Sequence, residues 1–126
     1  MRRTMLKSKL HRARVSDSDL HYVGSITIDA HLLEAADIRE HELVQVLDID
    51  NGNRFETNAI AGEPGSGELK VNGAAARMVH SGDTVIVLSY AAYDEDELDL
   101  HQPRVVHVDS ENRIVEVVPT PEELPA

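Results

Sequence analysis

Gly24 and Ser25 are the residues whose types and position could do chemistry, because they interrupt HYVGSITID, residues 21–29, which otherwise reads as one β-strand. Glycine weakens a strand interior, so it usually marks a bulge or a place where the backbone is approached closely. The residue that follows places a hydroxyl beside an unhindered peptide carbonyl. The pair is therefore either a bulge or a peptide bond at which a reaction occurs, and the residues alone leave both open.

Other patterns that could form a site lack the required spacing. Histidines recur every ten residues, at His11, His21, His31 and His41, but their surroundings differ and no two have the close spacing of a metal-binding pair. The glycines of GEPGSG, residues 62–67, lack the Lys-Ser/Thr of a phosphate loop. The acidic run at residues 94–99 is typical of a solvated face. We therefore predict neither a metal site nor a phosphate loop.

The composition limits both the fold and the function. Of the 126 residues 41% are hydrophobic but only 3% aromatic, so the core must be built from Val, Ile, Leu and Ala, which favours short strands. A net charge of −11 argues against nucleic-acid binding. The absence of cysteine excludes disulfides and thiolate chemistry. No apolar run approaches the ~20 residues of a membrane span, so we expect a cytoplasmic protein without a membrane or nucleic-acid partner.

Short alternating segments between turns predict the elements that must position Gly24 and Ser25. Strands are expected at residues 4–15, 20–28, 42–49, 54–61, 68–71, 84–93, 104–108 and 113–118. Turns are expected at residues 16–19, 50–53, 63–67 and 109–112, and one or two helical turns at residues 31–38. Six or more such strands predict a compact, mainly β barrel. We expect one domain over residues 1–118 and a flexible tail over residues 119–126.

Several separated motifs occur in order between residues 2 and 90: RTMLKSKLHRA, DLHYVGSITID, NGNRFET, and VNGAAA followed by GDTVIV. Together they resemble the aspartate 1-decarboxylase family, the pyruvoyl-dependent enzymes that make β-alanine for pantothenate synthesis. The resemblance implies a six-stranded double-psi β-barrel with short helices. It also implies a homotetramer with active sites between subunits.

The resemblance assigns self-processing chemistry to Gly24 and Ser25. The Ser25 hydroxyl would attack the Gly24 carbonyl and convert the amide to an ester. Elimination would then release the Gly24 carboxylate and leave dehydroalanine, which hydrolyses to a pyruvoyl group and ammonia. The products would be a β chain of residues 1–24 and an α chain of residues 25–126. The pyruvoyl cofactor derived from Ser25 would form a Schiff base with L-aspartate and accept electrons during loss of carbon dioxide.

The remaining site residues are also implied by the resemblance. Thr57 would assist self-processing. The substrate-binding positions are Lys9, Arg54, Thr57, Gly73, Ala74 and Ala75. Supporting positions near the processing site are His11, Tyr22 and Asn72. Arg54 and Thr57, three residues apart, would lie on opposite faces of a regular strand, which requires either a bulge or contributions to the sites of neighbouring subunits.

One departure from the family pattern keeps an alternative open. The family has a tyrosine as proton donor where this chain has Asn58, and a carboxamide cannot replace a phenol as a general acid. The alternative is therefore a non-catalytic or poorly active β-barrel that acts as a binding module. A third hypothesis is a hydrolase that cleaves itself through the ester and leaves serine at the new terminus.

Overall fold

The computed structural model describes residues 1–119, which are mainly β. The strands are β1 (Arg2–Arg14), β2 (Asp17–Asp19), β3 (Ser25–Asp29), β4 (Leu43–Asp48), β5 (Arg54–Gly62), β6 (Leu69–Asn72), β7 (Thr84–Asp94), β8 (Arg104–Val108) and β9 (Ile114–Val118). The short helices are α1 (Ala30–Ala36), the 3-10 helix η1 (Gly73–Arg77) and α2 (Glu95–Leu98). None of the described helices is long and apolar enough to cross a membrane.

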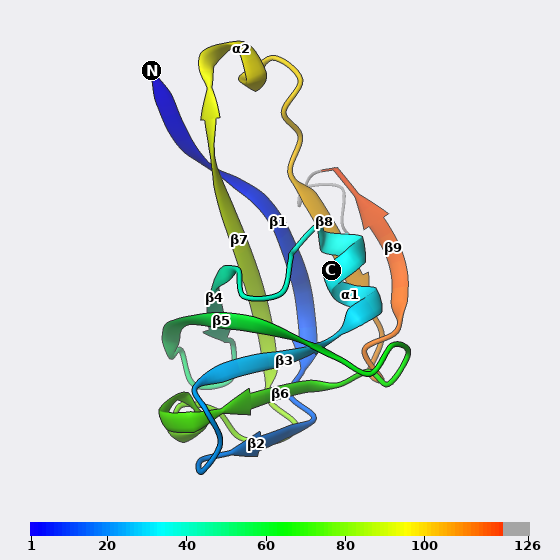
Figure 1. Cartoon of the computed structure of the whole chain (residues 1–126). Helices are drawn as coiled ribbons and strands as arrows, with labels where there is room; N and C mark the ends of the chain where they lie inside the picture. The colour runs from blue at the N-terminus through cyan, green and yellow to red at the C-terminus, as the bar shows by residue number, and fades with distance from the viewer. Residues whose placement is uncertain (120–126) are drawn as a thin grey trace.

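The strands are hydrogen-bonded in the order β2-β6-β3-β5-β4-β7-β1-β8-β9 (Figure 1). β1 pairs with β7 at one end of the β6-β3-β5-β4-β7 array, and β2 pairs with β6 at the other end. Because β2 directly follows β1 in the chain, the two ends of the array are brought together. The junction is reinforced where the Ser16 amide donates to the Leu69 carbonyl at 2.9 Å. This arrangement agrees with the predicted barrel class.

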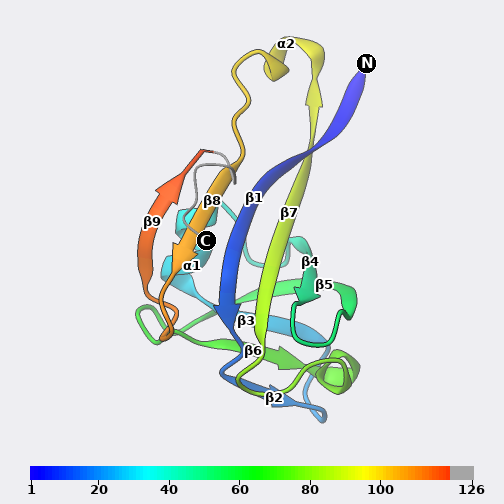
Figure 2. The same ribbon diagram turned by 180° about the vertical axis from the view of Figure 1, so that it is seen from behind.

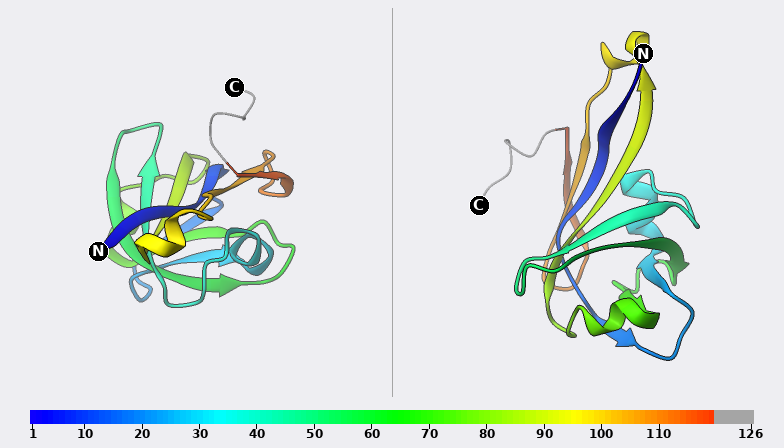
Figure 3. Two further views of the ribbon diagram at one scale, coloured as in Figure 1. Left: turned by 90° about the horizontal axis from the view of Figure 1, so that it is seen from above. Right: turned by 90° about the vertical axis from the view of Figure 1, so that its left-hand side faces the viewer.

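The structure has nine strands where six were predicted for the barrel. Two features account for the difference: the first strand is interrupted at Val15 and Ser16, and the β8–β9 hairpin is added beside β1. Figures 2 and 3 show that β1 and β7 run together beyond the body of the barrel, with α2 at their far end. The crossing pattern that defines a double-psi barrel stays a prediction. The predicted flexible tail lies, apart from Pro119, outside the described residues.

The core is built from small aliphatic side chains, as the composition predicted. Alternation places Leu10, Ile26, Ile28, Val46 and Val87 in one buried cluster at 0% exposure. On β3 the intervening residues Ser25 and Thr27 therefore lie on the opposite face of the strand.

Asp29 joins three segments at the end of β3. Its Oδ1 accepts hydrogen bonds from the amides of His31, at 2.8 Å, and Gly65, at 3.0 Å, while Oδ2 accepts from the Gly67 amide at 2.9 Å. Asp29 is thereby the N-cap of α1 and also holds the predicted turn at residues 63–67. These bonds fix the direction in which the chain leaves β3.

Two predicted elements were wrong. Residues 16–19, predicted as a turn, contain β2, because Asp17–Asp19 pair in parallel with Lys70–Asn72. The predicted strand at residues 20–28 begins only at Ser25. The acidic run at residues 94–99 is largely exposed, as predicted, and forms α2 with a capping box between Asp94 and Glu97.

Candidate active site

The Gly24–Ser25 bond lies where a loop enters β3 rather than inside a strand. Asp19 explains this: its carbonyl accepts from the Tyr22 amide at 3.4 Å, and its side chain accepts from the His21 amide at 3.0 Å. The chain therefore turns after β2 and resumes pairing only at Ser25, opposite Asn72. Because strand pairing begins at Ser25, the Gly24 side of this peptide bond makes no hydrogen bonds within the described sheet.

Ser25 is buried, and its hydroxyl is held by two partners. Ser25 is only 2% exposed, and its Oγ donates to the Val23 carbonyl at 3.1 Å. The Asn72 side-chain amide donates to Oγ at 3.0 Å and to Thr27 Oγ1 at 3.0 Å. These contacts direct the hydroxyl back along the chain, toward Val23.

Asn72 has an unused acceptor at this point. The residue is completely buried, its Nδ2 makes the two bonds just described, and its Oδ1 has no hydrogen-bond partner among the described residues. A buried acceptor without a partner costs about 1–3 kcal/mol, so such atoms are typical of sites that bind a further group. Asn72 was predicted as a supporting residue, and the structure brings it directly to Ser25.

Gly73 is the glycine that the local packing requires. Its φ is +76°, and a Cβ there would lie 2.7 Å from Gly24 Cα and 2.9 Å from Gly24 N. A Cβ on Gly24 would meet nothing within 4 Å. The backbone of η1 therefore packs against the Gly24–Ser25 segment, while the space beside Gly24 itself is open. Ala74, which is exposed, and Ala75, which is half-buried, follow in η1.

Tyr22 lies at the edge of this cluster. Its carbonyl would be 3.1 Å from a Cβ on Gly73, so its backbone also packs against η1. The Lys70 ammonium lies 5.5 Å from the centre of the Tyr22 ring. Lys70 and Thr27 were not predicted as site residues. Lys70 lies two residues from Asn72, and Thr27 lies two residues from Ser25. This alternation is the only sequence pattern that could have indicated them.

Thr57 and Asn58 lie on β5, the parallel neighbour of β3. In the β3–β5 pairing, Ile26 lies opposite Ala59. Continued back along both strands, it places Asn58 beside Ser25 and Thr57 beside Gly24. Both residues are half-buried, and among the described hydrogen bonds neither contacts Ser25.

Arg54 lies farther along β5. The β4–β5 pairing runs from Leu43↔Asn58 to Leu47↔Arg54 without a shift of register, so no bulge brings Arg54 onto the face of Thr57. Four residues of strand separate Arg54 from Asn58, or about 13 Å. Its guanidinium instead donates to Gln45 Oε1 at 3.2 Å. Of the two explanations for the spacing of Arg54 and Thr57, the bulge is excluded.

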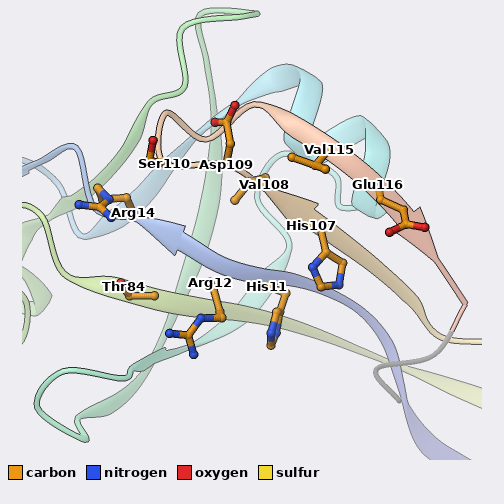
Figure 4. Close-up of a pocket in the computed structure, with 10 residues that line it drawn as sticks. All are labelled: His11, Arg12, Arg14, Thr84, His107, Val108, Asp109, Ser110, Val115 and Glu116. Atoms are coloured by element: carbon orange, nitrogen blue, oxygen red, sulfur yellow. The ribbon is translucent and has the colours of Figure 1, made fainter. Parts of the chain in front are cut away.

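Lys9 and His11 lie on β1, apart from Ser25. In the strand order β5, β4 and β7 lie between β3 and β1, so β1 and β3 are not hydrogen-bonded neighbours. His11 faces His107 of β8 with ring centres 5.1 Å apart, and both line a cavity of 380 Å³ that Arg12 also lines (Figure 4). Burial, followed by His107, lowers the pKa of His11. Among the described hydrogen bonds, neither Lys9 nor His11 contacts Ser25.

A comparison with protein families agrees with the motifs. The family model described as aspartate decarboxylase matches residues 1–115, which include every predicted site residue.

Proposed function

The chain belongs to the aspartate decarboxylase family, and from this premise we propose that it is a self-processing, pyruvoyl-dependent aspartate 1-decarboxylase. It converts L-aspartate to β-alanine and carbon dioxide, the step that supplies pantothenate biosynthesis. The observation that carries the proposal is the buried hydrogen bond from Asn72 to Ser25 Oγ, beside a peptide bond packed against Gly73.

Self-processing begins when Ser25 Oγ attacks the Gly24 carbonyl carbon. The new Oγ–C bond replaces the Gly24 C–N bond, which gives an ester and a free amine on residue 25. Loss of the α-proton and cleavage of the Cβ–Oγ bond release the Gly24 carboxylate and leave dehydroalanine. Water then displaces ammonia. Support for the first step comes from Asn72, which donates to Ser25 Oγ at 3.0 Å, and we assign to Thr57 the stabilisation of the carbonyl oxygen as it develops negative charge.

The residues around Ser25 fit a pyruvoyl group. When Ser25 loses its Oγ, Asn72 Nδ2 loses an acceptor and becomes free to donate to a carbonyl oxygen. Asn72 Oδ1, which already lacks a partner, can accept from the substrate's amine. Bound here, a pyruvoyl group supplies the ketone carbonyl that acts as the electron sink for decarboxylation.

The substrate's carboxylates are bound by a neighbouring subunit's Lys9 and Arg54. L-Aspartate brings two carboxylates, and an arginine fork binds one of them well. Because neither cation contacts Ser25 or Asn72 among the described hydrogen bonds, and the Arg54 guanidinium donates instead to Gln45 Oε1, we infer that both cations reach the site from another copy of the chain. This supports a homotetramer with active sites between subunits.

Intact mass spectrometry tests the processing. We expect purified protein to give two fragments divided between Gly24 and Ser25, the larger with an N-terminal pyruvoyl group. Ser25→Ala is expected to remain one chain. A larger fragment that begins with an intact serine would instead support hydrolysis of the ester. A wild-type chain that stays whole after prolonged warming would contradict self-processing.

Release of carbon dioxide from L-aspartate then tests turnover in the cleaved protein. Asn58→Tyr restores a phenol at the position that the β3–β5 register places beside Ser25, so it is expected to raise kcat. Equal rates would show that the proton donor lies elsewhere. Cleaved protein that releases no carbon dioxide in either form would favour the non-catalytic alternative.

A further inference from the structure

Three aspartates from two distant segments meet at the end of the barrel where β4 finishes and β7 begins. Asp48 ends β4, Asp50 lies in the turn before β5, and Asp83 precedes β7. One carboxylate oxygen of each lies within 4.8 Å of the others. Three like charges this close repel one another unless a proton or a cation lies between them.

Backbone amides donate hydrogen bonds to one oxygen of each carboxylate. Asp48 Oδ1 accepts from the amides of Asp50, at 2.9 Å, and Asn51, at 3.3 Å. Asp50 Oδ2 accepts from the Thr84 amide at 2.8 Å, and Asp83 Oδ2 accepts from the His80 amide at 3.0 Å. Backbone hydrogen bonds therefore fix the position of each carboxylate in the cluster.

One buried oxygen of Asp48, Oδ2, lacks a hydrogen-bond donor in the described part of the chain. Asp48 is only 1% exposed, and its Oδ2 has no hydrogen-bond partner among the described residues. The Asp83 carboxylate faces it, and burial together with that neighbour raises the pKa of Asp48 to about 6. Within residues 1–119 the only ion pair made by the three carboxylates is that of Asp83 with His80, at 4.0 Å.

The segments that carry the aspartates are also tied to each other. The side-chain amides of Asn51 and Asn53 both donate to the Met78 carbonyl, at 2.9 and 3.0 Å. The Ile49 amide donates to the Thr84 carbonyl at 2.9 Å. The β4–β5 turn is thus clamped against the segment that leads into β7, which preorganises the oxygens for a ligand.

We propose that Asp48, Asp50 and Asp83 bind a divalent cation, with Ca²⁺ as the best fit. Carboxylate oxygens are the ligands that hard cations prefer, and oxygens bound to one Ca²⁺ lie up to about 5 Å apart. Water completes the coordination on the side of Asp50, which is exposed. The ion joins the β4–β5 turn to the start of β7 and takes no part in the chemistry at Ser25. The proposal departs from the sequence-based prediction of no metal site, which considered histidine spacing and not these aspartates.

Calorimetric titration and thermal unfolding test the proposal on the full chain after treatment with a chelator. We expect about one Ca²⁺ per chain and a rise in Tm with CaCl₂, compared with NaCl at equal ionic strength. Asp50→Asn keeps an oxygen for the Thr84 amide but loses the charge, so it should bind Ca²⁺ at least about tenfold more weakly. Asp96→Asn, in the exposed α2, is the matched control and should bind normally.

Asp48→Asn separates a cation from a shared proton. Both explanations predict that it raises Tm without calcium, because it removes a buried like charge. Only a cation site predicts that the variant also loses the calcium-dependent rise. The proposal is overturned if the wild type shows no rise beyond NaCl, or if Asp48→Asn and Asp50→Asn keep it in full. A rise with MgCl₂ alone would support a divalent site and reject calcium as its ion.

Discussion

At the scale of single residues, Gly24 and Gly73, which lie close together in space at the processing site, have different physical roles. Gly24 has open space where a Cβ would stand, which suits a carbonyl that a hydroxyl must reach and a site that a substrate must enter. Gly73 has a left-handed backbone, and its α-carbon packs against the backbone of Gly24. The position at which a Cβ would clash is therefore Gly73 and not Gly24.

Gly73→Ala is expected to destabilise the chain by more than about 2 kcal/mol, because the left-handed backbone disfavours a Cβ and the overlap with Gly24 forces backbone atoms to move. Gly24→Ala, the matched control, should lie within about 1 kcal/mol of the parent. Urea unfolding of both variants in a Ser25→Ala background, where no cleavage interferes, gives the two free energies. Equal stability of the two variants would contradict the packing described for Gly73.

At the scale of elements, the sequence predicts strands whose apolar residues alternate and fails where pairing is set from far away. The strand at residues 84–93 and the turn at residues 50–53, which joins two antiparallel strands, follow from local pattern, and both are confirmed. Asp17–Asp19 carry no apolar residue and become a strand only because β6, some fifty residues later, lies beside them. Ser25 starts β3 for the same reason, since its partner is Asn72. The site residues were predicted from motif resemblance, whereas the carboxylate cluster joins segments that no local pattern connects.

The junction of β3, α1 and the turn at residues 63–67 depends on the charge of Asp29. Burial acts to raise the pKa of Asp29, but backbone hydrogen bonds from Gly67, His31 and Gly65 outweigh it and leave the pKa below its ordinary value of 3.8. The stabilisation is therefore present above that value and is lost as the pH falls through the lower pKa of the folded state.

Asp29→Asn is expected to lower the free energy of unfolding by about 2 kcal/mol near neutral pH, because one of the three amides then meets an NH₂ group instead of an oxygen. Urea unfolding at pH 7 and again below about pH 3 should show the gap between variant and parent narrowing as the parent's carboxylate becomes protonated. Asp96→Asn in α2 should show no such gap. A gap that is the same at both values of pH would mean that the charge of Asp29 contributes nothing.

At the scale of the whole molecule, the predicted site residues form two groups on one chain. The first surrounds Ser25 and includes Asn72 and Gly73. The second comprises Lys9 and Arg54, which lie on other parts of the sheet. Between them, apolar side chains are exposed on neighbouring strands: Leu43, the partner of Asn58, is 63% exposed, and Tyr90 is 42% exposed. An apolar surface beside a divided site is what a subunit interface would cover.

Complementation between inactive chains tests this division. Ser25→Ala lacks the cofactor and Arg54→Ala lacks a substrate cation, so each alone should release little carbon dioxide from L-aspartate. If a site takes Ser25 from one chain and Arg54 from another, random co-assembly leaves about a quarter of the sites with both residues intact, and activity should recover accordingly. These variants are made in the more active of two backgrounds, the wild type or Asn58→Tyr. The matched control is a mixture of Ser25→Ala chains with Asn72→Ala chains. Asn72 donates to Ser25 of its own chain, so no site in this mixture has both residues intact. Activity that stays at the level of the single variants in both mixtures would show that each chain completes its own site.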